Sequence, residues 1–166
     1  MLATAFGYAI CFNENDVRCM GRDAAGVRGI MLTDGDYVVG AEKAEEGKTL
    51  LTVTQNGYGK RTALTEYLRT GPNGEKQAQS RGGKGLKNYN ITPKTGNVAG
   101  CRVVSESDDV MLIENGGVII RIPASSINVY KRDVQGVIVM RIDDGNQVVS
   151  LERVEKMDEE ETGEQA

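Results

Sequence analysis

The chain has 166 residues, with 24 acidic and 20 basic side chains and no histidine. This length corresponds to one or two domains with enough residues for a core, and the absence of an 18-residue apolar run excludes a membrane-spanning helix. Without histidine the chain lacks the commonest general base and the commonest metal ligand. No other group of residues forms a catalytic constellation, so we predict neither a metal site nor a cofactor.

The start of the chain and its cysteines are typical of a cytosolic protein. Residues 1–8 lack the basic region and the long apolar region of a signal peptide. Cys11, Cys19 and Cys101 are an odd number of thiols at wide spacings. This pattern fits reduced cysteines better than a disulfide framework, and it has no pair at zinc-finger spacing.

An apolar strand, a glycine turn and a second strand occur three times along the chain. The three copies are residues 1–12, 51–62 and 111–122. Asn56-Gly57 and Asn115-Gly116 are strong signals for hairpins with type I′ turns, which need positive φ at both central residues, and Phe6-Gly7 is a weaker one. Each copy therefore predicts a β-hairpin.

Each hairpin is followed by the same series of elements, beginning with a short connection that has room for one helical turn. The connections are 13–17, 63–67 and 123–127. Glycine-containing anchors come next, at 26–30, 82–86 and 134–137. Each anchor leads into a strand and then a turn, at 33–36, 94–97 and 143–146. A further strand closes each copy, starting at 37, 98 and 147.

Four short strands per roughly 50 residues, separated by glycine turns, are typical of a propeller blade. We therefore predict an all-β, propeller-like array of four-stranded blades over residues 1–154, with blades at about 1–48, 49–108 and 109–154. Three blades are too few to close a ring, and Met1 falls inside a strand, so we expect a piece of a longer array. Residues 155–166 are acidic and poor in apolar side chains, which predicts a disordered tail.

The net charge of −4 hides a basic region. Residues 152–166 hold seven acids and two bases, whereas residues 58–87 hold seven bases and two acids. Within that region Arg81 and Lys84 flank the pair Gly82-Gly83. Glycines let a backbone come close to a ligand, and consecutive N–H groups can bind an anion. The stretch is not a nucleotide-binding P-loop, because Gly85 stands where that motif needs Ser or Thr.

Several segments resemble the C-terminal domain of the DNA gyrase A protein. They are residues 21–30, 54–62 with the sequence Thr-Gln-Asn-Gly-Tyr-Gly-Lys-Arg-Thr, and 135–138. Residues 79–85 match the family's box Gln-Arg-Arg-Gly-Gly-Lys-Gly except at Ser80. In the family the full box normally lies in the first blade, whereas this copy lies in the second-last. It is therefore similar to the box but does not stand in its position.

The resemblance implies a β-pinwheel, a disc of up to six blades that exchange strands, of which this chain would hold the last three. It implies double-stranded DNA wrapped on the rim without sequence reading, in support of ATP-dependent negative supercoiling. The implied partners are the rest of gyrase A and the gyrase B protein in an A2B2 holoenzyme, in the bacterial cytoplasm at the nucleoid. The cleavage tyrosine and the ATP site of the family lie elsewhere, so the isolated chain is expected not to be an enzyme.

The predicted DNA-binding residues are cations and glycines in loops at blade spacing, because a Lys or Arg at a phosphate releases counterions and bending DNA needs several such contacts. They are Arg22, Arg28, Lys60, Arg61, Arg81, Gly82, Gly83, Lys84, Lys87, Lys131 and Arg132. Two alternatives stay open. One is the equivalent domain of topoisomerase IV, and the other is a propeller-like scaffold whose basic loops bind an acidic protein.

Overall fold

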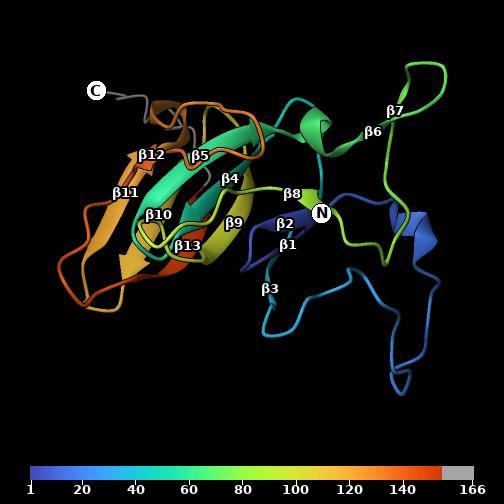
Figure 1. Ribbon diagram of the computed structural model, residues 1–166, viewed down its shortest axis with the longest axis horizontal. Helices are drawn as coiled ribbons and strands as arrows, with labels where there is room; N and C mark the ends of the chain where they lie inside the picture. The colour runs from blue at the N-terminus through green and yellow to red at the C-terminus, as the bar shows by residue number, and fades with distance from the viewer. Residues whose placement is uncertain (155–166) are drawn as a thin grey trace, which may run out of the picture.

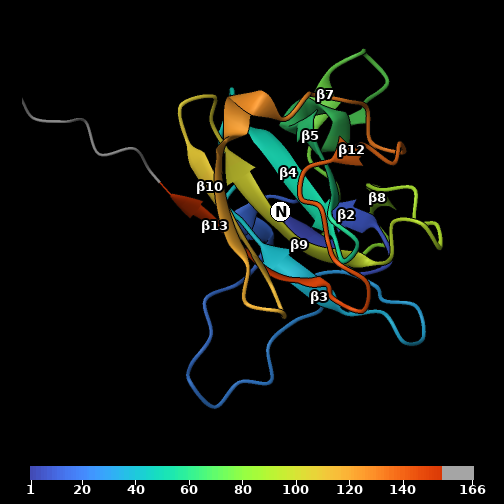
Figure 2. The ribbon, with the colours of Figure 1, turned by 90° about the vertical axis from the view of Figure 1, so that its left-hand side faces the viewer.

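The computed structural model describes residues 1–154, which form thirteen β-strands and three short 3₁₀ helices. Figure 1 shows the three larger sheets following one another along the longest axis of the molecule. A long loop at residues 12–36 and the β6–β7 hairpin project from this body, and the view turned by 90° places them on opposite sides of it (Figure 2). The predicted tail at 155–166 lies outside the described residues.

The first sheet has the strand order β3-β1-β2-β8 and is antiparallel. Its strands are β1 (Leu2–Thr4), β2 (Tyr8–Ile10), β3 (Val38–Ala41) and β8 (Leu86–Lys87). The second sheet has the order β12-β5-β4-β9. Its strands are β4 (Thr49–Thr54), β5 (Tyr58–Ala63), β9 (Val98–Val104) and β12 (Val137–Ile138).

The third sheet has three strands within the described residues, in the order β11-β10-β13. They are β10 (Asp109–Glu114), β11 (Ile119–Pro123) and β13 (Val148–Val154). Residues 69–77 fold back on themselves as the short hairpin β6 (Arg69–Thr70) and β7 (Lys76–Gln77). The predicted helical turns are confirmed as η1 (Glu14–Asp16), η2 (Leu64–Tyr67) and η3 (Ala124–Ser126).

Neighbouring repeats exchange strands, as the resemblance implied. β8 follows the glycine anchor of the second repeat, yet it pairs with β2 of the first, with Leu86 opposite Ala9. β12 follows the anchor of the third repeat and pairs with β5 of the second, with Val137 opposite Gly59. The all-β, propeller-like fold is thus confirmed. The blade boundaries drawn from the sequence stay a prediction.

The hairpin turns differ from the type I′ turns expected. Among residues 1–154 only glycines have positive φ, so Asn56 does not, while Gly57 has φ +78°. The Gly57 N–H donates to the carbonyl of Thr54 at 3.0 Å. This is the pattern of a three-residue loop closed by a left-handed glycine. In the third repeat the left-handed residue is Gly117, not Gly116.

Two cores hold the three sheets face to face. Successive side chains of a strand point to opposite faces, and the neighbours Leu50 and Leu51 accordingly enter different cores. One core lies between the first and second sheets and includes Tyr67 and Cys101, and the other lies between the second and third sheets and includes Leu112. The middle sheet is therefore buried on both faces. In the described part of the chain no helix is long and apolar enough to cross a membrane.

Candidate nucleic-acid interface

The basic stretch 79–87 is the loop that carries the chain into the exchanged strand β8. Its Gly85 has φ +78°, and a Cβ there would lie 2.5 Å from the carbonyl oxygen of Ala9 in β2. A side chain at this position would therefore push β8 away from the sheet that receives it. Gly136, which leads into β12, has φ +71° and would clash in the same way with the carbonyl of Gly59. These glycines serve the strand exchange.

Arg81 turns inward to the backbone of the first repeat. Its Nε donates to the carbonyl of Asp16 at 2.9 Å, and its Nη1 donates to the carbonyl of Arg28 at 2.6 Å. Beside it the Gly82 N–H donates to the carbonyl of Gly29 at 2.8 Å. The predicted use of the Gly82 N–H in an anion-binding nest is therefore wrong for this structure, because that N–H already has a protein acceptor.

Lys84 and Lys87 are exposed, as a phosphate contact requires. The Lys84 Nζ lies 4.9 Å from the centroid of the Tyr8 ring, a cation–π contact that orients the side chain and leaves its charge accessible. The Lys87 Nζ donates to Asn90 Oδ1 at 3.3 Å. The exposed hydrogen bond between Lys87 and Asn90 contributes little free energy, so a phosphate can replace the Asn90 amide at little cost. Both lysines therefore lie where a polyanion can reach them.

Lys60 is fully buried, contrary to the expected role at a phosphate. Its Nζ donates to Thr62 Oγ1 at 3.2 Å, to the carbonyl of Lys131 at 2.6 Å and to the carbonyl of Arg132. Burial lowers the pKa of this ammonium to about 7, and the nearby Asp133 opposes that shift. The side chain holds the backbone of the third repeat and does not reach the surface.

Arg61 is 4% exposed and also faces the third repeat. Its Nε donates to the carbonyl of Ile127 at 2.6 Å, and its Nη1 pairs with Glu106 Oε1 at 2.7 Å. A parallel bridge joins Arg61 to Val129, so the connection after η3 runs directly along β5. We therefore leave Lys60 and Arg61 out of the candidate DNA-contacting set.

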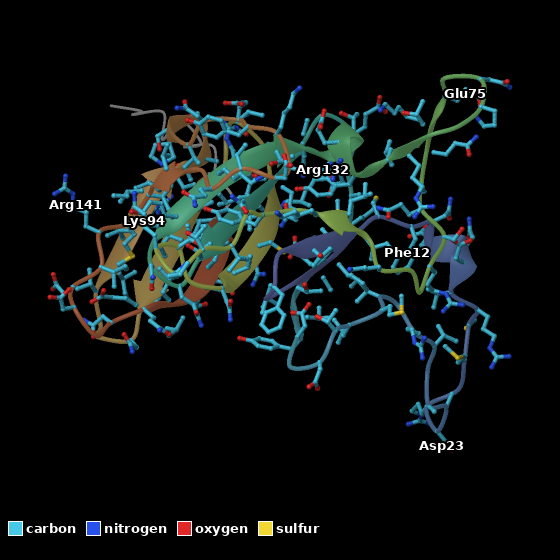
Figure 3. All side chains as sticks on the ribbon, viewed as in Figure 1. Phe12, Asp23, Glu75, Lys94, Arg132 and Arg141 are labelled. Atoms are coloured by element: carbon cyan, nitrogen blue, oxygen red, sulfur yellow. The ribbon has the colours of Figure 1, made fainter. Side chains whose placement is uncertain are left out.

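The loops of the outer two repeats carry exposed cations too. Arg22 and Arg28 are exposed in the long loop whose tip is marked by Asp23 in Figure 3. Lys131 is exposed, whereas Arg132 is half-buried and its Nη1 donates to the carbonyl of Lys87 at 3.0 Å. The accessible part of the predicted set is thus smaller than the sequence suggested. It consists of Arg22, Arg28, Lys84, Lys87 and Lys131.

Several exposed cations lie outside the predicted set, and two of them lie near the residues described above. Arg18 lies in the same loop as Arg22, and Lys94 lies in the turn of the second repeat with its Nζ 5.3 Å from the Tyr58 ring. The repeat gave no signal for Lys94, because Lys94 lies in the turn at 94–97, whereas Lys84, which contacts the equivalent ring of Tyr8, lies in the anchor at 82–86. In residues 1–154 no group of His, Cys, Asp or Glu could hold a metal ion.

A family model described as "DNA gyrase C-terminal domain, beta-propeller" matches residues 1–45, 48–76, 77–105 and 108–155. The DNA gyrase A protein of Staphylococcus epidermidis is 40% identical over 161 residues, which are 96% of this chain and 17% of that protein. The gyrase A protein of Escherichia coli K12 is 40% identical over 162 residues, 97% of this chain and 18% of that protein. The chain spans less than a fifth of the length of these relatives.

Two solved structures resemble the fold closely. A DNA gyrase A C-terminal domain is 29% identical with a TM-score of 0.80, and the match covers 92% of this chain and 49% of that one. A C-terminal domain of DNA topoisomerase IV is 28% identical with a TM-score of 0.82, covering 93% and 46%. The two similarities are nearly equal, so the backbone alone does not distinguish the two kinds of domain.

Proposed function

Because this chain belongs to the DNA gyrase C-terminal domain family, we propose that it binds double-stranded DNA through exposed cations and bends it, without reading base sequence. The observation that carries the proposal is the position of these cations. Lys84 and Lys87 flank the start of one exchanged strand, Lys131 precedes the other, and Arg28 stands at the equivalent anchor of the first repeat. Strand exchange thus repeats a basic loop from one sheet to the next.

The chemistry of this set suits phosphates better than base edges. Each Lys or Arg that meets a phosphate releases condensed counterions, which supplies affinity that does not depend on sequence. Bending a short duplex costs a few kcal/mol, so contacts at several successive loops are needed to hold the bend. The set contains lysines and arginines on loops, and it includes no recognition helix.

We further propose that the bound DNA serves a larger enzyme. In that enzyme, the rest of gyrase A and the gyrase B protein would form an A2B2 assembly in the bacterial cytoplasm and at the nucleoid. Negative supercoiling with ATP would belong to the assembly, and strand cleavage and ATP hydrolysis would be carried out outside this chain. The topoisomerase IV alternative is not favoured, because the family model and the curated relatives described above are gyrase proteins.

The test is a titration of the chain onto a linear duplex of about 60 base pairs, shorter than the persistence length of about 150 base pairs. The double variant Lys84→Ala/Lys131→Ala removes two accessible cations. The slope of log affinity against log salt is negative, and we expect its magnitude to decrease by about 0.9 for each lost phosphate contact. The control is Arg141→Ala, since Arg141 is exposed and lies at the far end of the molecule from the long loop (Figure 3).

We expect the control to leave the slope unchanged and duplexes of different sequence to bind equally well. No binding by the wild-type chain at low salt would contradict the proposal. A loss of slope per removed charge that is equal in the double variant and the control would also contradict it, because the charge would then act only through its total. Capture of an acidic protein together with failure to bind DNA would favour the scaffold alternative.

A further inference from the structure

We infer that Arg81 and Arg132 are positioning residues that tie each basic loop to the preceding repeat, and that they do not themselves hold phosphate. The inference rests on the proposed function, because it concerns how the proposed DNA contacts keep their spacing. A sequence-based view treats every arginine in these loops as a phosphate ligand. The structure separates the cations into accessible ones and ones that donate to protein carbonyls of another repeat.

The two arginines occupy the same place in the repeat. Each stands four residues before a left-handed glycine, Arg81 before Gly85 and Arg132 before Gly136. Both glycines lie against the backbone of the sheet that receives the exchanged strand, as shown by the short distances from an added Cβ to the carbonyls there. The arginines therefore enter the junction between repeats at corresponding points.

Both guanidinium groups donate to main-chain carbonyls of the preceding repeat. Arg81 reaches Asp16 and Arg28, at 2.9 and 2.6 Å. Arg132 donates through Nη1 to the carbonyl of Lys87 at 3.0 Å, while its Nε is buried with no hydrogen-bond partner among the described residues. A guanidinium has a rigid fork of five N–H donors, so one side chain can fix more than one carbonyl. A lysine has no such fork, which makes Arg→Lys an informative substitution.

The residues held in this way are the ones proposed to meet DNA. Arg81 fixes the backbone of Arg28, whose own side chain is exposed. Arg132 fixes the backbone of Lys87, whose side chain is also exposed. Each tie thus connects one repeat to the contact residue of the repeat before it. Loss of a tie would leave the contact charge in place but free its position relative to the next loop.

The third repeat has a second tie that acts from the opposite direction. The buried Lys60 of β5 donates to the carbonyls of Lys131 and Arg132. The backbone of Arg132 is thereby held by the second repeat while its side chain holds that repeat in return. The hydrogen bond from the Arg132 side chain to Lys87 in β8 agrees with a role in the junction.

The experiment compares Arg81→Lys and Arg81→Ala with Lys84→Ala in the 166-residue chain. Two quantities are measured on the duplex, the salt slope of binding and the end-to-end distance by energy transfer. We expect Lys84→Ala to decrease the magnitude of the negative salt slope by about 0.9. We expect both Arg81 variants to keep the wild-type salt slope. The end-to-end distance of the bound duplex should be longer than with the wild-type chain, because the DNA is bent less. Arg132→Ala should behave like Arg81→Ala, which guards against a defect peculiar to one site.

A third measurement reports on the tie in the absence of DNA. The Gly82 amide, which donates to the carbonyl of Gly29, should exchange its hydrogen about tenfold faster or more in Arg81→Lys, because hydrogen bonds to a charged group beside it are lost. Lys84→Ala should leave that rate unchanged. If Arg81→Lys retains the bend and Arg81→Ala lowers the slope as Lys84→Ala does, Arg81 is a phosphate ligand and the inference is wrong. Absence of wild-type binding would instead contradict the proposed function.

Discussion

The substitution Gly57→Ala tests whether the exchanged strand β12 stabilises the fold. Gly57 has φ +78°, and an alanine Cβ there would lie 2.0 Å from the carbonyl oxygen of Met140, which follows β12. The matched control is Gly117→Ala. Gly117 is the corresponding hairpin glycine of the third repeat, with φ +94°, and in the described part of the chain nothing lies within 4 Å of its added Cβ. The two variants share backbone strain and differ in the neighbouring strand.

The structure gives the size of the expected difference. Left-handed backbone costs an alanine about 1–2 kcal/mol, and both variants incur this cost. In Gly57→Ala the segment after β12 must also move, which breaks the hydrogen bonds from the N–H groups of Val139 and Met140 to the Gly57 carbonyl, at 2.9 and 3.2 Å. Each such bond contributes about 0.5–1.5 kcal/mol. Gly57→Ala should therefore destabilise by about 1–3 kcal/mol more than Gly117→Ala.

Urea unfolding followed by circular dichroism measures the difference. We expect a lower midpoint for Gly57→Ala than for Gly117→Ala, with equal slopes if the unfolded states are alike. Equal losses of unfolding free energy in the two variants would refute the reasoning. That result would mean that β12 leaves β5 at little cost, and that the strand exchange contributes nothing measurable to stability.

Three further predictions follow from the buried and exposed groups. The folded pKa of Lys60, about 7, lies below its ordinary value of 10.5, so between these values the unfolded state binds more protons and the free energy of unfolding should rise with pH. Lys60→Met should abolish that rise, as urea unfolding at several pH values between 7 and 9 would show. The window ends at pH 9 because the raised pKa of the buried Cys101 thiol makes the free energy of unfolding fall with pH above that value. A thiol reagent should modify the exposed Cys19 in the native chain, and Cys11 and Cys101 only after unfolding, as mass spectrometry would show. Gly136→Ala should destabilise more than Gly145→Ala, since an added Cβ meets the Gly59 carbonyl at 2.2 Å in the first and nothing within 4 Å among the described residues in the second, and calorimetry would rank them.

The sequence predicted the arrangement of strands and turns because each depends on local chemistry. The hairpins, the single helical turns and the closing strand of each repeat are confirmed, since apolar runs and glycines mark their ends. The strand expected after each anchor forms in the second and third repeats, but none forms between 26–30 and 33–36 in the first. The turn type was wrong for a local reason as well. An Asn-Gly pair permits a type I′ turn, but in the second repeat the loop has three residues and only Gly57 is left-handed.

The burial and the hydrogen-bond partners of the basic residues could not be predicted, because they depend on contacts between residues distant in sequence. Lys60 and Arg61 stand on a strand of which both faces are covered, and the carbonyls that receive them come from residues 127–132. Nothing near Lys60 in the sequence marks those carbonyls. Arg81 and Lys84 look alike in the sequence, yet Arg81 points to the backbone of the first repeat and Lys84 lies over the half-buried ring of Tyr8. Lys84, Lys87 and Lys131 are exposed, and their contact with DNA stays a prediction.

The exchange of β8 and β12 has a mechanical consequence. A stiff polymer that is bent around a protein pulls outward on every loop that grips it. Because β8 is joined to the second repeat by the chain and to the first by ladder hydrogen bonds, the pull on its loop is shared by both repeats. Two repeats can separate only by breaking that ladder together with the core between them. An outward force on one loop is therefore distributed over two neighbouring repeats.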